Sequence, residues 1–180
     1  MVPFVSLDAG DEELAVSVAR HHAASLADRL GVPTFLYEAA DPHGRPLPQL
    51  RREAFHGREP DFGPPEPHPT LGATAVGARP VLVAVNYELA GTDLDAAARI
   101  ARLVRASGGG LPGVRALAFP IASRGVVQVS MNLVALEQTG LGEALTSVRT
   151  LAETEHLESA GVELVGLAPR AELARCPPEI

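Results

Sequence analysis

Eight of the 16 prolines in this 180-residue chain lie between Ala39 and Gly72. Proline fixes its own φ angle and has no backbone N–H to donate, so a segment this rich in proline leaves little room for a long helix or a central strand. The sequence therefore predicts a long loop or linker between two parts of the chain. We place the domain boundary within it, giving a first domain over residues 1–58 and a second over residues 59–180.

The first part has the pattern of a βαβ unit, with strands predicted at residues 2–7 and 32–37 and a helix at residues 11–30. Apolar residues recur along this helix at the 3.6-residue period: Leu14, Val18, Leu26 and Leu30. His22 falls at the centre of the arc, so we expect it to pack in the core. A unit of this size buries too little surface to be stable alone, and we expect it to dimerise or to expose a sheet edge.

The second part has the order β-α-β-β-α-β, followed by a short helical turn at residues 170–175. The predicted elements are strand 80–89, helix 93–107, strands 114–122 and 126–136, helix 142–157 and strand 162–167. This order is that of the split-βαβ, or ferredoxin-like, arrangement, in which an antiparallel sheet carries both helices on one face. The predicted fold class is therefore α+β, and the other face of the sheet is left bare.

The predicted strand 126–136 places polar side chains on that bare face. Its alternation puts Gln128, Ser130 and Asn132 on one side, and on the other an apolar set: Val127, Val129, Met131 and Leu133. The polar row is typical of a groove that binds a ligand, and equally of a solvated sheet face. An RNA-recognition module would need aromatic side chains on this strand for base stacking, and the strand has none.

Composition narrows the possible partners and compartments. The formal net charge is −7, which argues against nucleic-acid binding, and no apolar run approaches the ~20 residues that span a bilayer. Cys176 is the single cysteine, so an internal disulfide is impossible, and no Cys/His spacing resembles a zinc site. The start of the chain lacks the basic region of a secretory signal. We expect a soluble cytoplasmic protein that binds neither membrane nor metal.

Residues 61–79, with the sequence DFGPPEPHPTLGATAVGAR, form the most specific motif in the chain. Gly63, Gly72 and Gly77 allow positive φ or close approach to a ligand, while the prolines restrict the shape of the loop in advance. The motif matches no phosphate-binding pattern. Arg79 at its end could pair with an acidic ligand such as a carboxylate, or form a simple surface ion pair.

Several further motifs accompany this loop: VPFVSL at the start, VPTFLYEAA, Leu50-Arg-Arg-Glu-Ala-Phe55, Asn86-x-x-Leu89-x-Gly91-Thr92, Gln128-Val-Ser-Met-Asn132-Leu and Glu163-Leu-Val-Gly-Leu-x-Pro169. Together they cover essentially the whole chain. The combination resembles the formiminotransferase domain of glutamate formiminotransferase and of formiminotransferase-cyclodeaminase.

The resemblance implies a fold, a reaction and a ligand. It implies two similar ferredoxin-like subdomains, of which the first is partial here, with tetrahydrofolate as co-substrate in the groove between them. The strand alternation, rather than the family motif, predicts that the polar row of Gln128, Ser130 and Asn132 lines this groove. The resemblance also implies transfer of a formimino group from N-formimino-glutamate to tetrahydrofolate, in one-carbon metabolism and histidine degradation. The folate-contacting loop corresponds to these residues: Gly63, Pro64, Pro65, Glu66, Pro67, His68, Pro69, Thr70, Leu71 and Gly72.

The chain departs from the family at its start. The family's catalytic histidine lies in a segment just upstream of the strand that opens this chain, and Met1 stands at that junction. No histidine here occurs at the matching motif, so the sequence predicts no catalytic residue. We expect a homo-oligomer, or a second chain that supplies the segment. A folate-binding or assembly protein without catalysis, or an interaction module without folate, remains an alternative.

Overall fold

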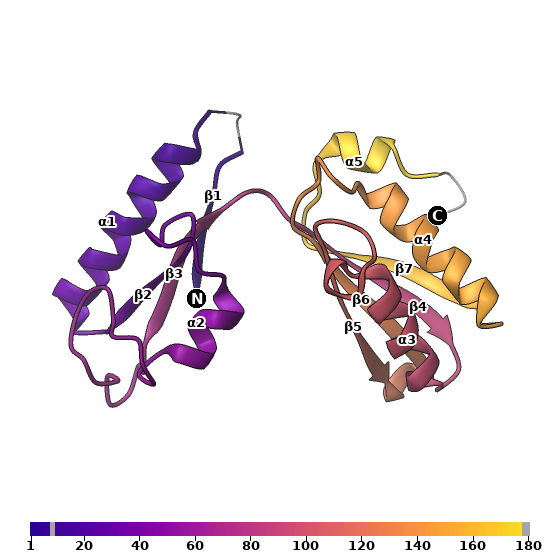
Figure 1. The fold of residues 1–180 in the computed structure, drawn as a ribbon, viewed down its shortest axis with the longest axis horizontal. Helices are drawn as coiled ribbons and strands as arrows, with labels where there is room; N and C mark the ends of the chain where they lie inside the picture. Colours follow the sequence, from indigo (N-terminus) through magenta and orange to yellow (C-terminus); the bar gives the residue numbers. More distant parts are fainter. Residues whose placement is uncertain (8–9, 178–180) are drawn as a thin grey trace. The chain divides into compact units, whose positions relative to one another are not determined.

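The structure is a computed structural model that describes residues 1–7 and 10–177 (Figure 1). The chain divides into two compact units between Pro80 and Val81. This differs from the boundary at residues 58/59, because Thr74–Arg79 forms a strand, β3, whose partners lie in the first part of the chain. The expectation that residues 61–79 form one loop is therefore wrong for its last third.

Unit 1, residues 1–80, is built around a parallel sheet in the order β1-β3-β2. Its elements are β1 Val2–Val5, α1 Glu12–Leu30, β2 Thr34–Glu38, α2 Leu47–Glu53 and β3. Leu36 and Val76 face α1, whereas Phe35 and Tyr37 pack with Leu50 of α2. The two helices thus cover opposite faces of the sheet (Figure 1), as expected for parallel strands.

Helix α1 buries an alanine stripe, not the leucine arc predicted. Ala19, Ala23 and Ala27 are buried, whereas Leu14 and Val18 are 60% and 42% exposed. Leu30 is also exposed, and of the predicted arc only Leu26 packs against the core. The expectation that His22 is a core residue is also wrong.

His22 lies half-buried on the flank of α1. There its ring meets the edge of the Phe4 ring, with centroids 5.4 Å apart. This is the side of the helix that faces β1, because Phe4 belongs to that strand.

The proline-rich segment is folded rather than a linker. It contains α2, and its buried Arg58 donates hydrogen bonds to Leu36 O at 2.7 Å and to Asp61 Oδ2 at 3.0 Å. Asp41, also buried, receives two hydrogen bonds from the Arg45 guanidinium. Burial alone would raise the pKa of Asp41, but these bonds and others outweigh it and hold the pKa at about 2.

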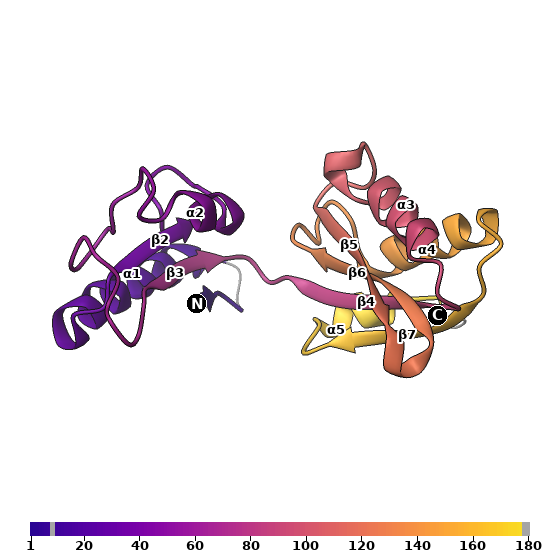
Figure 2. The same cartoon turned by 90° about the horizontal axis from the view of Figure 1, so that it is seen from below.

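Unit 2, residues 81–180, has the predicted α+β class. Its elements are β4 Val83–Ala90, α3 Leu94–Val104, a 3₁₀ turn Ala106–Gly108, β5 Val114–Ile121, a second 3₁₀ turn Ala122–Arg124, β6 Val126–Leu133, α4 Leu141–Thr154, β7 Ser159–Val165 and α5 Arg170–Ala174. Every strand pair is antiparallel, in the order β5-β6-β4-β7. Figure 2 shows β4 between β6 and β7, the order of a split-βαβ fold.

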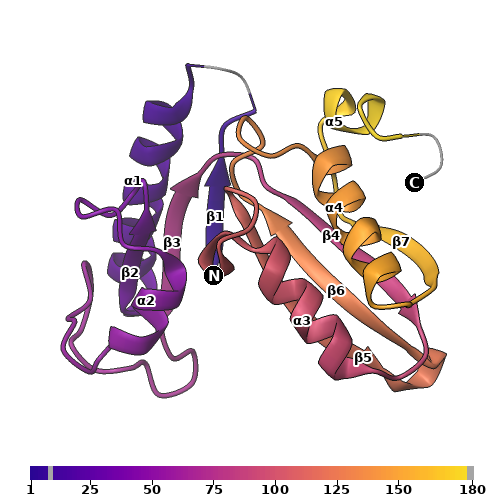
Figure 3. The same cartoon turned by 45° about the vertical axis from the view of Figure 1, so that its right-hand side comes forward.

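The core of unit 2 lies between one face of this sheet and helices α3 and α4 (Figure 3). Val127, Val129 and Met131 face these helices, which confirms the alternation predicted for the strand. Asp93 caps α3 by accepting the N–H of Ala96 at 2.9 Å. Among the described residues, every helix is too short or too polar to cross a membrane.

Candidate functional site

The proline-rich loop in unit 1 begins with an antiparallel bridge to the first residue of β2. The N–H of Thr34 donates to Phe62 O at 2.9 Å, and the N–H groups of Asp61 and Phe62 donate to Thr34 O. Gly63 follows with φ +89°, and a Cβ at this position would lie 3.2 Å from the Cβ of Ala27. Glycine is needed here for both reasons, so the loop leaves the sheet in a defined direction.

His68 organises the tip of the loop. Its backbone exchanges two hydrogen bonds with Gly72, at 2.8 and 2.9 Å. Its ring Nδ1 accepts the N–H groups of Thr70 and Leu71, at 3.3 and 3.1 Å. Because Nδ1 is an acceptor, the proton of the neutral ring lies on Nε2. The ring is thus part of the turn, and Nε2 is the ring atom left to meet a ligand.

The remaining residues of the predicted folate loop are exposed: Gly63, Pro64, Pro65, Glu66, Pro67, Pro69, Thr70 and Leu71. His68 and Gly72 are half-buried. The loop therefore offers a surface of proline rings and backbone groups whose shape is set before a ligand arrives.

Arg79 ends β3 and belongs to a small cationic cluster. Its Nη1 donates to Pro80 O at 3.1 Å. Burial raises the pKa of the nearby Tyr37 phenol and the negative charge of Glu38 adds to the rise, while the positive charges of Arg79 and Arg51 oppose it. Arg79 also hydrogen-bonds the phenol. The Tyr37 ring covers Gly77, where a Cβ would lie 2.6 Å from it. Two guanidinium groups and a phenol thus gather here beside the carboxylate of Glu38.

The polar face predicted in unit 2 extends over more strands than the sequence indicated. In the sheet register Asn86 of β4 lies opposite Ser130, and Glu88 opposite Gln128. Asn86 and Glu88 are 9% and 3% exposed, although this face carries no helix. Polar side chains at such burial need partners.

Both buried groups have partners on the same face. Asn86 Nδ2 donates to Glu163 Oε2 at 2.8 Å, and the two terminal nitrogens of Arg124 donate to the Glu88 carboxylate at 2.6 Å each. Arg124, in the 3₁₀ turn between β5 and β6, thus covers a buried carboxylate. The centre of the face is therefore a fixed hydrogen-bonded surface rather than a freely solvated one.

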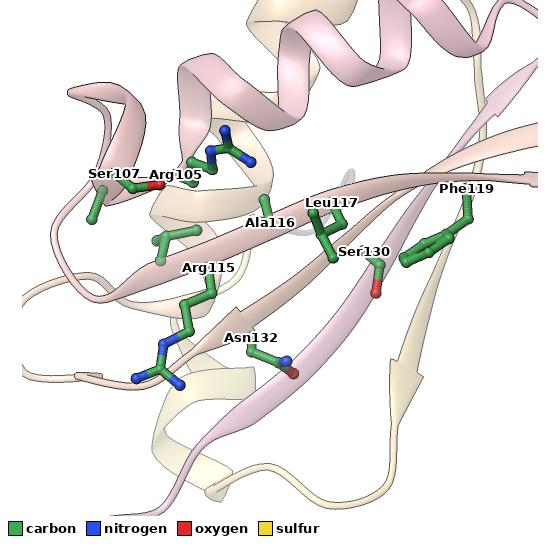
Figure 4. Close-up of a pocket in the computed structure, with 10 residues that line it drawn as sticks. Arg105, Ser107, Arg115, Ala116, Leu117, Phe119, Ser130 and Asn132 are labelled. Carbon is green, nitrogen blue, oxygen red and sulfur yellow. The ribbon is translucent and has the colours of Figure 1, made fainter. Parts of the chain in front are cut away.

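A pocket of about 600 Å³ opens beside the edge strand β5 (Figure 4). Its polar lining comes from Arg105 and Ser107 after α3, Arg115 of β5, and Ser130 and Asn132 of β6. In Figure 4 the side chains of Arg115 and Asn132 lie side by side, and their Cα atoms are register partners. The structure thus brings together two of the three predicted residues of β6. Gln128 does not line this pocket but lies opposite Phe119.

The sequence interpretation missed four residues of these two regions, the phenol Tyr37 and three arginines: Arg51, Arg105 and Arg115. Arg115 could have been found, because it occurs at alternate spacing with Leu117 and Phe119 in a predicted strand. Arg105 and Tyr37 carry no such signal, since their neighbours come from distant parts of the chain.

Among the described residues, no three His, Cys, Asp or Glu side chains gather in a way that could hold a metal ion. Cys176 is half-buried, and burial together with the nearby Glu172 raises the pKa of its thiol. A thiol of raised pKa is a weaker nucleophile at neutral pH.

Comparison with known proteins identifies the family. Residues 1–79 match the family described as "Formiminotransferase domain, N-terminal subdomain", and residues 84–177 match "Formiminotransferase domain". The chain belongs to the formiminotransferase domain family. The two matched segments correspond closely to units 1 and 2.

Relatives in this family carry names that agree with the match. Glutamate formimidoyltransferase of Streptococcus pyogenes is 35% identical over 95% of this chain, and that of Thermoplasma acidophilum 33% over 96%. Formimidoyltransferase-cyclodeaminase of Sus scrofa is 35% identical over 93%. The chain spans 61% of the length of the first two relatives and 34% of the third.

Proposed function

We propose that this chain binds tetrahydrofolate as part of a formiminotransferase that uses N-formimino-glutamate as donor. The observation that carries the proposal is the pocket beside β5. Ser130 and Asn132, predicted from the alternation along the strand, line it together, and its volume of about 600 Å³ suits a small organic molecule. Its polar groups and the apolar Leu117 and Phe119 fit a ligand that is part aromatic and part polar.

The proposed transfer needs no oxidant or reductant, because it exchanges one carbon–nitrogen bond for another. N5 of tetrahydrofolate attacks the formimino carbon of the donor, and the bond from that carbon to the glutamate nitrogen breaks. The proton of N5 ends on the departing amine, so glutamate leaves with a free amino group. Proton transfer by a positioned side chain typically contributes about 10²- to 10⁴-fold to such a step.

Each predicted residue has a proposed role in binding. The loop from Gly63 to Gly72 supplies a preformed surface against the ligand, and the guanidinium of Arg79, beside Tyr37, pairs with a carboxylate. In unit 2, Ser130 and Asn132 donate or accept hydrogen bonds in the pocket, and Gln128 extends the same polar row.

A folate-binding role without catalysis is the second candidate. It is favoured by His68, the histidine of the proposed loop, whose Nδ1 is occupied by two backbone N–H groups. A ring held in this way serves the shape of the loop. Turnover separates the two candidates, because a binding protein takes up tetrahydrofolate and leaves N-formimino-glutamate unchanged.

The test is a calorimetric titration of the 180-residue chain with 5-formyl-tetrahydrofolate. We expect saturable binding that weakens about tenfold in Arg79→Gln and in Asn132→Ala, since each loses a hydrogen bond to the ligand. Arg52→Gln is the matched control, because Arg52 is an exposed arginine of α2. Absence of saturable heat in the unchanged chain would refute folate binding by these residues.

We further propose that two copies of the chain associate through the edge of β1. In the described residues β1 pairs with β3 on one side, and no strand pairs with its other edge. Light scattering should give twice the mass of 18.8 kDa. A monomer whose amides in residues 2–5 resist hydrogen exchange would contradict this. A cytoplasmic location stays a prediction from the sequence.

A further inference from the structure

The loop from Gly63 to Gly72 is fixed at both ends by residues at the start of β2. Before the loop, the N–H of Asp61 donates to Thr34 O at 2.9 Å. After the loop, the N–H of Thr74 donates to Pro33 O at 2.9 Å. The two ends therefore meet at neighbouring residues, as in a compact Ω-loop, and the tip between them has to hold its own shape.

One residue, His68, forms the hydrogen bonds of that tip. From Gly63 to Gly72, a stretch that the structure describes in full, every hydrogen bond has His68 at one end. Four of these ten residues are prolines, which have no backbone N–H to donate. The shape of the tip therefore depends on the backbone pair between His68 and Gly72 and on one atom of the ring, Nδ1.

The hydrogen bonds of Nδ1 require a neutral ring. Nδ1 lies 3.3 and 3.1 Å from the backbone nitrogens of Thr70 and Leu71, and 3.3 Å from Thr70 Oγ1. The two N–H groups can only donate, so Nδ1 must keep its lone pair free to accept them. A proton on Nδ1 would remove the acceptor and direct one donor at two others. The protonated ring is thus incompatible with the tip that the structure shows.

The loop contains one other ionisable residue, Glu66, which is exposed. Among the described residues, neither Glu66 nor His68 forms an ion pair, and Asp61 at the base of the loop is paired with Arg58. Histidine is the side chain that ordinarily changes its charge between about pH 5 and 8. The hydrogen bonds of the tip are therefore open to control by pH through a single ring.

We propose that His68 is a positioning residue: its neutral ring holds the tip of the loop in the shape that binds the ligand, and protonation of the ring releases the tip. The inference rests on the proposed function for the contact between the loop and tetrahydrofolate, and on the hydrogen bonds of Nδ1 for the lock itself. Because only the neutral ring holds the binding shape, ligand binding should weaken as the pH falls through the range in which histidine titrates.

The first experiment follows the lock in the ¹⁵N-labelled chain without ligand. The ring nitrogens of His68 report by NMR which of them carries the proton, and the amides of Thr70 and Leu71 report the shape of the tip. At pH 8 we expect the proton on Nε2. As the pH falls to 5.5, the two amides should shift along the same curve as the ring. Amides that stay in place while the ring gains its second proton would overturn the proposal.

Asparagine at this position separates the acceptor from the charge. In Asx turns its Oδ1 atom accepts backbone N–H groups of the following residues, and it gains no proton in this pH range. His68→Asn should therefore keep the Thr70 and Leu71 amides in place from pH 8 to pH 5.5, whereas His68→Ala should lose both hydrogen bonds at either pH. His56→Asn is the matched control, at an exposed histidine outside the loop. Circular dichroism verifies that each variant is folded.

Calorimetric titration with 5-formyl-tetrahydrofolate at the two pH values tests the consequence for binding. The unchanged chain and His56→Asn should bind about tenfold more weakly at pH 5.5 than at pH 8, since the acceptor for two N–H groups is lost. The carboxylates of the probe are ionised at both pH values. His68→Asn should bind with the same affinity at both. A pH dependence of undiminished size in His68→Asn would assign it to another group and refute the positioning role.

The outcomes separate this inference from the proposed function. If the tip amides follow the ring and 5-formyl-tetrahydrofolate binds equally well at both pH values, binding does not depend on the tip and the positioning role is wrong. If the amides follow the ring and the probe binds at neither pH, the proposed function fails while the lock formed by the neutral ring stands. If the probe binds and the amides do not respond to the ring, the proposed function stands and this inference is refuted.

Discussion

The two units of this chain are stabilised in different ways. Among the described residues, the core of unit 2 gathers 19 buried apolar side chains between one sheet face and two helices. Unit 1 divides its core between two sheet faces, with six buried residues toward α1 and three toward α2. Much of the α1 side is alanine, which buries little apolar area per residue.

Unit 1 also contains a buried ionic network, centred on Arg58. Arg58 lies 3.5 Å from Asp41 and 3.0 Å from Asp61, and its guanidinium carbon is 5.9 Å from the centre of the Phe35 ring. Through its bond to Leu36 O this network joins the proline-rich segment to β2. The network thus ties a long ordered loop to a small core, although the Nη1 atom of Arg58 is buried without a hydrogen-bond partner. The loop depends on the ion pairs that the other atoms form.

The strongest test of this difference removes a charge from the network. Asp41→Asn should destabilise unit 1 by about 4 kcal/mol, because it leaves Arg45 and Arg58 without their shared carboxylate in a buried site. Hydrogen exchange of peptides covering β2 and α2 measures the loss. Asp28→Asn, at an exposed position of α1, is the control. Unchanged exchange in β2 would show that the network is dispensable.

The corresponding test in unit 2 removes apolar volume. Leu145→Ala should cost about 3 kcal/mol, since Leu145 is 2% exposed at the centre of the α4 face and its loss leaves a cavity. The loss of stability is measured by urea unfolding, monitored through hydrogen exchange of peptides that cover β6. The matched substitution Leu103→Ala, at an exposed position of α3, should have little effect. Equal losses of stability in Leu145→Ala and Leu103→Ala would contradict the position of the core.

Acid should weaken unit 1 through Asp41. The pKa of this carboxyl is about 2 in the folded chain against an ordinary 3.8. A lowered pKa contributes stability that is complete above the unfolded value and is lost as the pH falls toward the folded one. We therefore expect unit 1 to lose about 2 kcal/mol between roughly pH 5 and pH 1. Exchange in β2 measured across this range checks it, and Asp41→Asn should lack this contribution.

The smallest effect concerns the start of α4 in unit 2. Glu172 Oε2 accepts the N–H of Leu141 at 2.9 Å in a buried position, and Arg175 pairs with the same carboxylate. Glu172→Gln keeps an acceptor and loses the charge, so we expect a cost of about 1 kcal/mol. Exchange at the first turn of α4 measures it, with the exposed Glu143→Gln as control. A larger loss in the control would assign the effect to the helix dipole rather than to the cap.

The sequence was sufficient to predict a helix or strand wherever the residues of that element show its hydrophobic period. Neighbouring residues alone predicted the order of elements in unit 2. They also predicted that Ser130 and Asn132 lie on one face of β6 and that Val129 and Met131 lie on the other. The same holds for the motifs that identify the family. The whole-face arrangement of Asn86, Glu88 and Arg124 was not predicted, because it depends on strand register.

By itself the sequence determined the fold class, the family and one strand of the candidate site. Only the tertiary structure decided that Thr74–Arg79 is a strand, that alanines rather than leucines of α1 are buried, and that Arg115 stands beside Asn132. The reason is physical: periodicity reports which residues of one element share a face. Which face is buried, and which charges meet on it, depends on segments far apart in the chain.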